Sequence, residues 1–530
     1  MKFKASYNRC GWNRGLAFHY PNRSYPDSFR IPPTAKPPSS LKFEKVPLAH
    51  ETGYAKNVAL KGFMVSVDSA PTPYDSEKEW IMPSIPPISS CPMRALESQD
   101  KKSGKVSRRL RYGLFSVYNR LVSLVFIANL SIIILYITKL EQVQLSVLST
   151  WASANFLLAI LVRQDFFINL LFRTAWHVPW WMSLRIRRTV ARVYTYGGIH
   201  SGAAAAGTAW WILYTSIMTA TYSGQGLFYA AVIVLTWLVQ ALLILIILFA
   251  CPHLRSKSHN AFEISHRYAG WSAIVLLWIQ LLAQSYHEQQ KSGEPQAHIL
   301  GKAPTFWNLT AMTALLAQPW IRLRKWSFTP EHLSSHALRL HFKNHVHRFS
   351  VLSISTSPLC EWHPFATFPD PDGQGASMVI SSAGDWTRQQ IASPRCTYWV
   401  KGSPRPGVLS LTCIFKRVVI VTTGSGIGPC LSSLMDNPEN QFCRLVWSTR
   451  TPVETFGKGI MEMVMTVDPE AVVIDSKVMG RPDLERVAYK EFLECGAEAV
   501  FVLSNREVTE KVVLGLECRG VPAFGPIWDS

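Results

Sequence analysis

Long apolar runs dominate the middle of the chain. A membrane-spanning helix needs about 20 predominantly apolar residues, with a range of about 17–25. Six segments approach or reach this length: 116–137, 145–162, 197–220, 227–250, 268–286 and 304–320. The fourth segment contains no charged residue, which disfavours a water-soluble helical bundle. The pattern therefore predicts an α-helical transmembrane bundle of about six spans over residues 114–322.

The pattern changes to short alternating stretches after about residue 326. Apolar and polar residues alternate there, and Gly and Pro separate the stretches. This alternation is typical of antiparallel strands and predicts a small β-barrel over residues 326–415. The expected strands include residues 337–342, 349–354, 378–380 and 398–400.

Residues 416–530 show a different order of elements, in which β-branched apolar runs alternate with helical patterns. Such an order is typical of a parallel sheet covered by helices. We therefore expect a doubly wound α/β domain, the last domain of a multi-domain chain. Its expected strands are 418–422, 443–448, 471–475 and 499–503, and its expected helices include 483–494 and 506–516.

The first 113 residues are polar and rich in Pro and Ser, and they lack sustained apolar periodicity. A segment of this composition cannot bury enough apolar surface to offset the entropy lost on ordering. Residues 1–113 are therefore predicted to be disordered.

Charge adds a topology to the bundle. The chain carries a net charge of +19 and has a pI of about 9.5. Much of the positive charge lies in the N-terminal region and in alternate connections, while the opposite connections are neutral or mixed. The positive-inside rule then places both termini in the cytosol, with a lipid bilayer as partner. Because this distribution explains the charge, nucleic-acid binding is not required. The basic residues concerned are Lys105, Arg108, Arg109, Arg111, Arg185, Arg187, Arg188, Arg192, Arg255, Lys257, Arg322, Arg324 and Lys325.

Two histidines lie near the cytosolic ends of the expected helices. His200 opens the third segment and His266 opens the fifth, so they could face each other as two axial ligands of one haem. The alternative is a pair of interfacial histidines at helix ends. A second haem would need ligands four turns further along, where the chain has Leu213 or Tyr214, and Ile279 or Gln280.

A glycine-rich turn follows the first strand of the α/β region. Gly424, Gly426 and Gly428 allow a tight turn whose N–H groups approach a phosphate closely, and Pro429 suits the first turn of a helix. The turn predicts a dinucleotide phosphate at that helix N-terminus, although an ordinary strand-turn-helix connection has the same pattern. Cys430 lies beside it, either as a packed or as a reactive thiol. The ten cysteines show no metal-binding spacing, so free thiols are expected.

The order of bundle, barrel and glycine-turn domain resembles the ferric reductase and NADPH oxidase superfamily, and most closely the fungal TmpA-type membrane flavoproteins. The resemblance covers residues from about 105 to the C-terminus. Five sequence stretches carry it: Trp362-His363-Pro364-Phe365-Ala366-Thr367, Gly384-Asp385-Trp386-Thr387, Val400-Lys401-Gly402 with Gly407, Gly424-Ser425-Gly426-Ile427-Gly428-Pro429, and Gly480-Arg481-Pro482-Asp483.

The resemblance implies FAD on the barrel and NADPH or NADH on the α/β domain. His363 and Thr367 would hydrogen-bond the flavin, and Phe365 would stack on it. Arg450 would bind a ribose 2′-phosphate, which favours NADPH. Trp528 would cover the isoalloxazine, or simply pack with the tail. The implied cofactor-binding set is His363, Pro364, Phe365, Thr367, Gly402, Gly407, Gly424, Gly426, Gly428, Pro429, Arg450, Gly480 and Arg481.

The expected function is transfer of hydride from NAD(P)H to FAD on the cytosolic face of a membrane, with an unknown electron acceptor. The resemblance links such proteins to redox homeostasis or developmental signalling. Two departures from the family pattern keep alternatives open, namely Ala366 in the flavin motif and Ser504 where Cys-Gly-Pro usually follows the late strand. One alternative is a nucleotide-binding, redox-sensing protein with little turnover. The other is a ferric or oxygen reductase with a single haem at His200 and His266.

Overall fold

The structure is a computed structural model that describes residues 115–139, 143–371 and 373–527. All of these belong to one compact unit. The predicted disorder of residues 1–113 and the proposed role of Trp528 lie outside the described residues.

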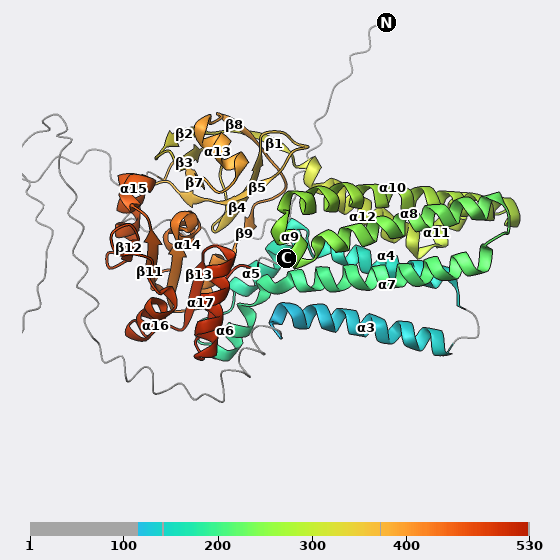
Figure 1. Ribbon diagram of the computed structural model, residues 1–530, viewed down its shortest axis with the longest axis horizontal. Helices are drawn as coiled ribbons and strands as arrows, with labels where there is room; N and C mark the ends of the chain where they lie inside the picture. The colour runs from blue at the N-terminus through green and yellow to red at the C-terminus, as the bar shows by residue number, and fades with distance from the viewer. Residues whose placement is uncertain (1–114, 140–142, 372, 528–530) are drawn as a thin grey trace, which may run out of the picture. The chain divides into compact units, whose positions relative to one another are not determined.

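Each of the six apolar segments forms a helix (Figure 1). Three of the described helices, α3, α8 and α10, are long and apolar enough to cross a membrane, and α4 with the bent α5 makes a fourth if that pair counts as one span. The prediction of six helices is therefore confirmed, whereas six membrane spans are not established by length and hydropathy. The six helices are α3 (Val117–Lys139), α4 (Leu145–Leu161), α7 (Gly197–Tyr222), α8 (Leu227–Ala250), α10 (His259–Ser292) and α12 (Pro304–Ile321).

Helix α7 is not among the candidate spans, and its small residues let it pack closely against its neighbours. A Cβ added at Gly198 would lie 2.5 Å from the Tyr118 carbonyl oxygen of α3, and one at Gly207 would lie 2.7 Å from the Phe156 ring of α4. Small residues permit such close helix contacts in membranes, where lipid offers no hydrophobic driving force for association. Helix α7 thus lies between α3 and α4 (Figure 1).

Shorter helices connect the six long ones. Helix α5 bends by 62° away from α4 and contributes Ile168 and Phe172 to the same apolar core as the α/β domain. Part of the chain between the second and third apolar segments is therefore packed against the C-terminal domains. The connecting elements are α5 (Asp165–Trp176), α6 (Leu184–Val190), η3 (Val193–Tyr196), α9 (Pro252–Lys257) and α11 (Gln296–Lys302).

The expected barrel strands form two antiparallel sheets around one core. One sheet has the order β1-β8-β4-β5, with β9 also paired to β4, and the other has the order β2-β3-β7-β6. Leu340, Ile354 and Tyr398 from the two sheets meet in the core they share. The antiparallel prediction is confirmed, with two sheets in place of one closed ladder among the described strands. Their bounds are β1 (Arg324–Ser327), β2 (Thr329–His332), β3 (Ala337–Phe342), β4 (Ser350–Ser355), β5 (His363–Ala366), β6 (Phe368–Pro369), β7 (Ala376–Ser381), α13 (Asp385–Ala392), β8 (Thr397–Val400), β9 (Arg405–Pro406) and η4 (Val408–Ile414).

The C-terminal domain is a doubly wound parallel sheet, as predicted. Its strand order is β12-β11-β10-β13-β14, with all four pairings parallel. Val418 and Ile420 of β10 pack with α14 and α15 on one face, and Val419 and Val421 pack with α16 and α17 on the other. The elements are β10 (Arg417–Thr423), η5 (Gly424–Gly426), α14 (Ile427–Met435), β11 (Phe442–Thr449), α15 (Pro452–Val467), β12 (Val472–Asp475), α16 (Leu484–Glu494), β13 (Ala499–Leu503), α17 (Arg506–Cys518) and β14 (Ala523–Phe524).

Candidate functional site

The crevice of the α/β domain lies where its strand order reverses. Strand β10 is flanked by β11 and β13, so the connections after β10 and β13 leave the same edge of the sheet toward opposite faces. In open α/β sheets ligands bind at such a switch point, outside the carboxyl ends of the strands. The Thr422 hydroxyl donates to the Leu503 carbonyl oxygen at 2.8 Å, and Thr423 and Ser504 are joined by a hydrogen bond between their hydroxyls. The two loops of the crevice are therefore tied together.

The predicted glycine turn occupies this crevice. Gly424 has a φ of +49°, in the left-handed region. A Cβ at Gly426 would lie 2.1 Å from the Thr422 hydroxyl oxygen and 2.9 Å from the Leu503 carbonyl oxygen, so only glycine lets the turn approach the strand ends. Pro429 lies in the first turn of α14, as expected. The Trp447 indole donates to the Gly424 carbonyl oxygen at 3.0 Å and holds the turn in place.

Other predicted cofactor residues lie at the same edge of the sheet. Ser448 pairs with Thr423 in the β11–β10 register, and Arg450 follows two residues later as an exposed side chain. Gly480, with a φ of +73°, and Arg481 are exposed in the loop that follows β12. The edge thus brings together the glycine turn and two cationic side chains, which suits an anionic dinucleotide.

The glycine turn also abuts the barrel. A Cβ added at Gly428 would lie 3.5 Å from the Val379 Cβ of β7, in ordinary van der Waals contact. The flavin motif lies on β5, where His363 pairs with Ile354 and Pro364 with Ser353 of β4. The two predicted cofactor regions are therefore parts of adjoining domains.

His363 belongs to an aromatic stack that the sequence did not predict. Its ring lies 4.1 Å from the Trp386 ring at an interplanar angle of 24°, and the Phe365 ring lies 6.1 Å from Trp386 at 24°. Burial lowers the pKa of His363, against the opposing effect of the Glu361 and Glu263 carboxylates, so the imidazole is neutral at pH 7. Its Nε2 is 3.7 Å from Glu361, beyond hydrogen-bond distance. The buried Trp386 Nε1 has no hydrogen-bond partner among the described residues.

The ring nitrogens His363 Nε2 and Trp386 Nε1, which lack hydrogen-bond partners among the described residues, fit an added ligand such as a flavin, since buried polar atoms are normally hydrogen-bonded.

Thr367 does not fit its expected role, because its hydroxyl is buried and donates to the Ser350 carbonyl oxygen at 3.1 Å. The sequence prediction included Trp386 in the Gly384-Asp385-Trp386-Thr387 stretch but gave it no role. An aromatic residue within a flavin-reductase-like motif is the pattern from which its stacking role could have been predicted.

The loop after β8 already holds an anion. The Ser403 N–H donates to Asp165 Oδ2 at 2.9 Å, and Arg405 Nε lies 3.4 Å from Asp165 Oδ1. A Cβ at Gly402, whose φ is +71°, would lie 2.2 Å from Asp165 Oδ2. Gly407 lies one residue before η4. The loop that contains Gly402, one of the residues that the resemblance assigns to cofactor binding, therefore already contacts the Asp165 carboxylate. No pattern in the sequence pointed to Asp165.

Cys430 is a packed thiol. It is fully buried beneath the glycine turn, and burial raises its pKa to about 12. A thiol with so high a pKa carries almost no thiolate at neutral pH, which excludes the reactive alternative. The eight described cysteines are all free, as predicted.

The structure brings His200 and His266 together. Their ring centroids are 6.2 Å apart, with an interplanar angle of 57°. His200 Nδ1 lies 2.9 Å from the Ala159 carbonyl oxygen, which fixes the proton on Nδ1 and leaves Nε2 free. Two nitrogens that bind one metal from opposite sides lie about 4 Å apart, and the centroid separation accommodates this because ring nitrogens lie on the perimeter of each ring. The ring separation would allow the two imidazoles to hold one metal ion between them.

A second ligand pair is absent at the positions four turns along. Gln280 Nε2 donates to the Tyr214 hydroxyl at 3.2 Å, so the two residues bind each other directly. No cluster of three or more His, Cys, Asp or Glu that could hold a metal ion occurs within residues 115–139, 143–371 and 373–527.

Two solved structures resemble parts of the chain. A ferredoxin NADP⁺ reductase from Neisseria gonorrhoeae with bound FAD and NADP is 12% identical, with a TM-score of 0.32, over 39% of this chain and 99% of that one. A flavohemoglobin from Malassezia yamatoensis with bound FAD and heme is 13% identical, with a TM-score of 0.34, over 71% of this chain and 98% of that one.

Two curated relatives are much closer in sequence, and both are from Coprinopsis cinerea. Adenylate-forming reductase 03009 is 40% identical over 432 residues, which are 81% of this chain and 42% of the relative. Adenylate-forming reductase 06235 is 39% identical over 436 residues, which are 82% of this chain and 42% of the relative. The chain thus spans less than half the length of these relatives. None of these four proteins is named as a TmpA-type flavoprotein or a ferric reductase, so that finer resemblance stays a prediction.

The C-terminal part of the chain has the most specific match. Residues 408–530 match the family described as the C-terminal domain of adenylate-forming reductase 03009. This range contains the parallel sheet, the glycine turn and Arg450. The chain is accordingly similar, through its α/β domain and over most of its length, to the part of adenylate-forming reductases that includes their C-terminal domain.

Proposed function

We propose that this chain is a membrane-anchored flavin oxidoreductase that accepts hydride from NAD(P)H on FAD at the cytosolic face. One observation carries the proposal: the glycine turn lies at the switch point of a parallel sheet and abuts β7 of the barrel through Gly428 and Val379. A dinucleotide on the N-terminus of α14 would then lie next to the domain that carries the flavin motif.

The side chains of this chain would bind and orient the cofactors. Neutral His363 and the Trp386 indole would supply hydrogen bonds to the flavin, and Phe365 would supply an apolar face. Arg450, with Arg481 nearby on the same edge of the sheet, would bind the phosphates of NADPH. When bound, FAD supplies the capacity to accept a hydride and to pass on electrons.

The membrane anchor is part of the proposal. Helices α3, α8 and α10 have the length and composition of membrane spans. The basic connections favour both termini in the cytosol, although two of those arginines have structural partners, because Arg187 binds Glu498 and Arg192 binds Glu517. The C-terminal domains would then have access to cytosolic NAD(P)H.

The curated relatives are named as reductases, in agreement with this proposal. Adenylate formation is not proposed for this chain, because the matched region is only 42% of each relative. The electron acceptor is not assigned.

An absorption spectrum tests the proposal directly. The full chain is purified in detergent with added FAD, and its spectrum is recorded before and after anaerobic addition of NADPH. An oxidised-flavin band that bleaches within minutes supports the proposal. A folded protein that binds FAD without bleaching, or that stays colourless, overturns it.

Two observations favour the alternatives. The His200–His266 pair suits a single haem, which predicts a Soret band that either His200→Ala or His266→Ala abolishes. The Asp165 carboxylate beside Gly402 and the internal bond of the Thr367 hydroxyl suit a regulatory protein with little turnover. That alternative predicts saturable nucleotide binding without flavin bleaching.

A further inference from the structure

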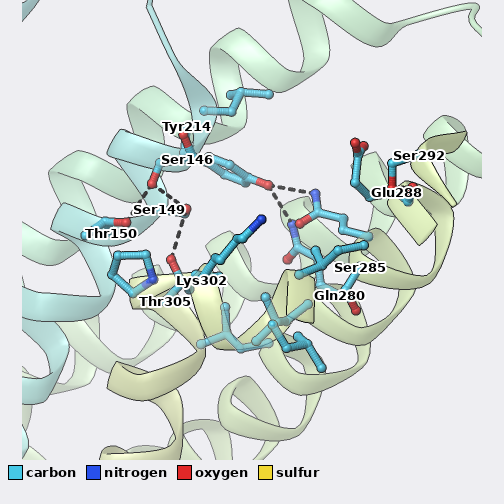
Figure 2. A pocket seen from close by; sticks show the side chains of 18 of the residues that line it. Ser146, Ser149, Thr150, Tyr214, Gln280, Ser285, Glu288, Ser292, Lys302 and Thr305 are labelled. Atoms are coloured by element: carbon cyan, nitrogen blue, oxygen red, sulfur yellow. Dashed lines mark hydrogen bonds between the residues drawn. The ribbon is translucent and has the colours of Figure 1, made fainter. Parts of the chain in front are cut away.

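A cavity of about 680 Å³ lies inside the helical bundle (Figure 2). It is lined by the N-terminal ends of α4 and α12, by α7 and by the C-terminal half of α10. The opposite ends of α4 and α12 lead to α5 and β1, so the cavity lies at the end of the bundle away from the C-terminal domains. Its volume falls in the range of about 300–1,000 Å³ that is typical of small-molecule sites.

The floor of the cavity is a buried hydrogen-bond network. The Tyr214 hydroxyl accepts hydrogen bonds from Gln280 Nε2 at 3.2 Å and from Gln284 Nε2 at 3.0 Å (Figure 2). Gln280 Nε2 also donates to the Thr236 hydroxyl at 2.9 Å. Polar groups at this depth in an apolar bundle are costly and are usually functional.

Two hydrogen-bonding capacities of this network are unused. Gln280 is 3% exposed, and its Oε1 has no hydrogen-bond partner among the described residues. The Tyr214 oxygen already receives two N–H donors, so its own proton is left to donate. The floor therefore offers one acceptor and one donor side by side. A single hydroxyl group satisfies both, because it can donate to Gln280 and accept from Tyr214.

The side chains of the cavity wall indicate what kind of molecule would carry that hydroxyl group. The indole of Trp211 lies in an apolar part of the lining with Leu277, Leu281, Ile299 and Leu300, and other parts carry the hydroxyl groups of Ser146, Ser149, Thr150, Ser285, Ser292 and Thr305. Trp211 Nε1 lies 3.4 Å from the Thr236 carbonyl oxygen, so its ring is held in a fixed orientation. A flat aromatic body packs well against such a ring.

The mouth does not select a charged ligand. Lys302 Nζ is 3.3 Å from Glu294 Oε2, and His298 Nδ1 is 3.1 Å from the same oxygen, so charges of both signs are paired there, beside the exposed carboxylate of Glu288. The floor itself carries no charge and would leave an ionic group without a counter-charge, which is unfavourable away from water.

We propose that this cavity binds an uncharged phenol or aryl alcohol, with its hydroxyl between Gln280 Oε1 and the Tyr214 hydroxyl and its ring against Trp211. This site is separate from the nucleotide crevice and from the His200–His266 pair, and it does not depend on the flavin proposal.

Equilibrium dialysis of the purified full chain tests this site with two probes. 2-Naphthol carries the hydroxyl, whereas 2-methoxynaphthalene has the same ring system without a hydrogen to donate. We expect saturable binding of one 2-naphthol per chain and at least ten-fold weaker binding of the methoxy probe, since that probe leaves Gln280 Oε1 unpaired. Gln280→Met, which preserves length and removes the amide, is expected to weaken 2-naphthol binding at least ten-fold. Ser216→Ala, on the exposed face of α7, is the matched control and is expected to bind like the wild type.

The comparison of the two probes on the wild-type chain needs no variant, so the test holds even if Gln280→Met does not fold. Equal binding of both probes to the wild type would indicate partition into detergent or apolar surface and would overturn the proposal. Absence of saturable 2-naphthol binding would mean that the cavity holds only water, which also overturns it.

Discussion

The carboxylate of Asp165 fills the space that a side chain at Gly402 would need. Asp165 is the first residue of α5, which follows the second apolar helix, and Gly402 lies in the barrel loop after β8. The loop N–H of Ser403 donates to Asp165 Oδ2 at 2.9 Å, and Arg405 lies close to its other oxygen. This contact joins the helical part of the chain to the predicted flavin domain through one partly buried carboxylate.

The fit between Asp165 and Gly402 predicts that Gly402→Ala is destabilising for two reasons. The φ of +71° places residue 402 in the left-handed region, which costs about 1–2 kcal/mol for a residue with a Cβ. The added Cβ would also lie 2.2 Å from Asp165 Oδ2 and would force that carboxylate out of its contacts. We expect a lower thermal midpoint for the purified Gly402→Ala chain, measured by intrinsic fluorescence.

Two further variants separate these causes. Asp165→Ala combined with Gly402→Ala should be less destabilised than the sum of the single changes, because the clash is then removed and the two sites are in contact. Gly459→Ala is the matched control, since Gly459 lies within α15 with open space around it and is expected to be neutral or slightly stabilising. If the destabilising effects of Asp165→Ala and Gly402→Ala were strictly additive, the proposed clash between Asp165 and a Cβ at residue 402 would be contradicted.

A second prediction concerns the ion pair between Arg187 of α6 and Glu498, which precedes β13. Arg187 Nη1 and Nη2 lie 2.7 and 2.8 Å from the two carboxylate oxygens of Glu498, and Arg187 is 5% exposed. Arg187→Met leaves a Glu498 carboxylate that is 23% exposed and still accepts from the Lys416 N–H, so we expect a cost of roughly 1–3 kcal/mol, below the roughly 3–5 kcal/mol of a fully buried pair. Arg187→Met should therefore lower the thermal midpoint, whereas Arg185→Met, at an exposed neighbouring arginine, should change it little. Equal effects would show that the pair does not stabilise the fold.

This ion pair also gives acid sensitivity with a defined sign. Burial alone would raise the pKa of Glu498, but hydrogen bonds from Arg187 and from the backbone N–H groups of Lys416 and Arg417 hold it below its ordinary value of 4.5. A carboxyl group with a depressed pKa contributes stability above the pKa of the unfolded chain and loses it as pH falls through the folded value. The stabilisation should be complete above about pH 5 and should decrease as the pH falls below 4.5 and through the folded pKa, where the wild type should approach Glu498→Gln.

The sequence predicted the elements of the C-terminal domain well, because continuous β-branched runs are specific to buried parallel strands. Strand β13 has the predicted bounds, 499–503, and α16 begins one residue from its expected start. A separate argument, from the positions of His200 and His266 near the cytosolic ends of two apolar segments, identified them as a facing pair, although α10 begins seven residues before His266. Patterns within single segments were sufficient in these cases.

Contacts between distant elements were not predictable in the same way. Thr367 has the residue type expected to bind flavin, but strand pairing turns its hydroxyl toward the Ser350 carbonyl oxygen. Arg187 has the residue type of a topology-determining charge, yet its partner, Glu498, lies 311 positions away in the sequence. Side-chain direction and long-range pairing depend on tertiary packing, which a single sequence does not specify.

A third prediction concerns Lys401 in the barrel. Burial, together with the neighbouring Arg267 and Arg405 charges, lowers its pKa from 10.5 to about 8. Its ammonium lies 4.7 Å from the Trp362 ring centroid and 5.6 Å from that of Trp320. Because the unfolded chain binds this proton more tightly, the cost of a charged Lys401 in the folded state is full below pH 8 and decreases as pH rises from about 8 to 10.5.

Lys401→Arg tests this sign, because arginine stays charged throughout that range. The thermal midpoint of the wild type relative to Lys401→Arg should rise as the buffer changes from pH 7 to pH 10. A difference that stays constant would show that Lys401 does not titrate in this window, and a difference of the opposite sign would contradict the lowered pKa.

The last prediction tests the nucleotide edge of the α/β domain. Arg450 is exposed and lies two residues beyond Ser448, the partner of Thr423 beside the glycine turn. If the flavin proposal holds, its guanidinium is placed to bind a ribose 2′-phosphate, a group that NADPH has and NADH lacks. With ferricyanide as an artificial electron acceptor, Arg450→Ala should raise KM for NADPH at least ten-fold, corresponding to about 1.4 kcal/mol, and should leave KM for NADH within about two-fold. Lys458→Ala, which removes an exposed cation from α15, is the control and should leave both constants unchanged. An equal rise in both KM values would mean that Arg450 contacts a part that NADPH and NADH share. No change in either KM would mean that another residue recognises the 2′-phosphate. Arg481, which is exposed at the same edge of the sheet, is then the candidate.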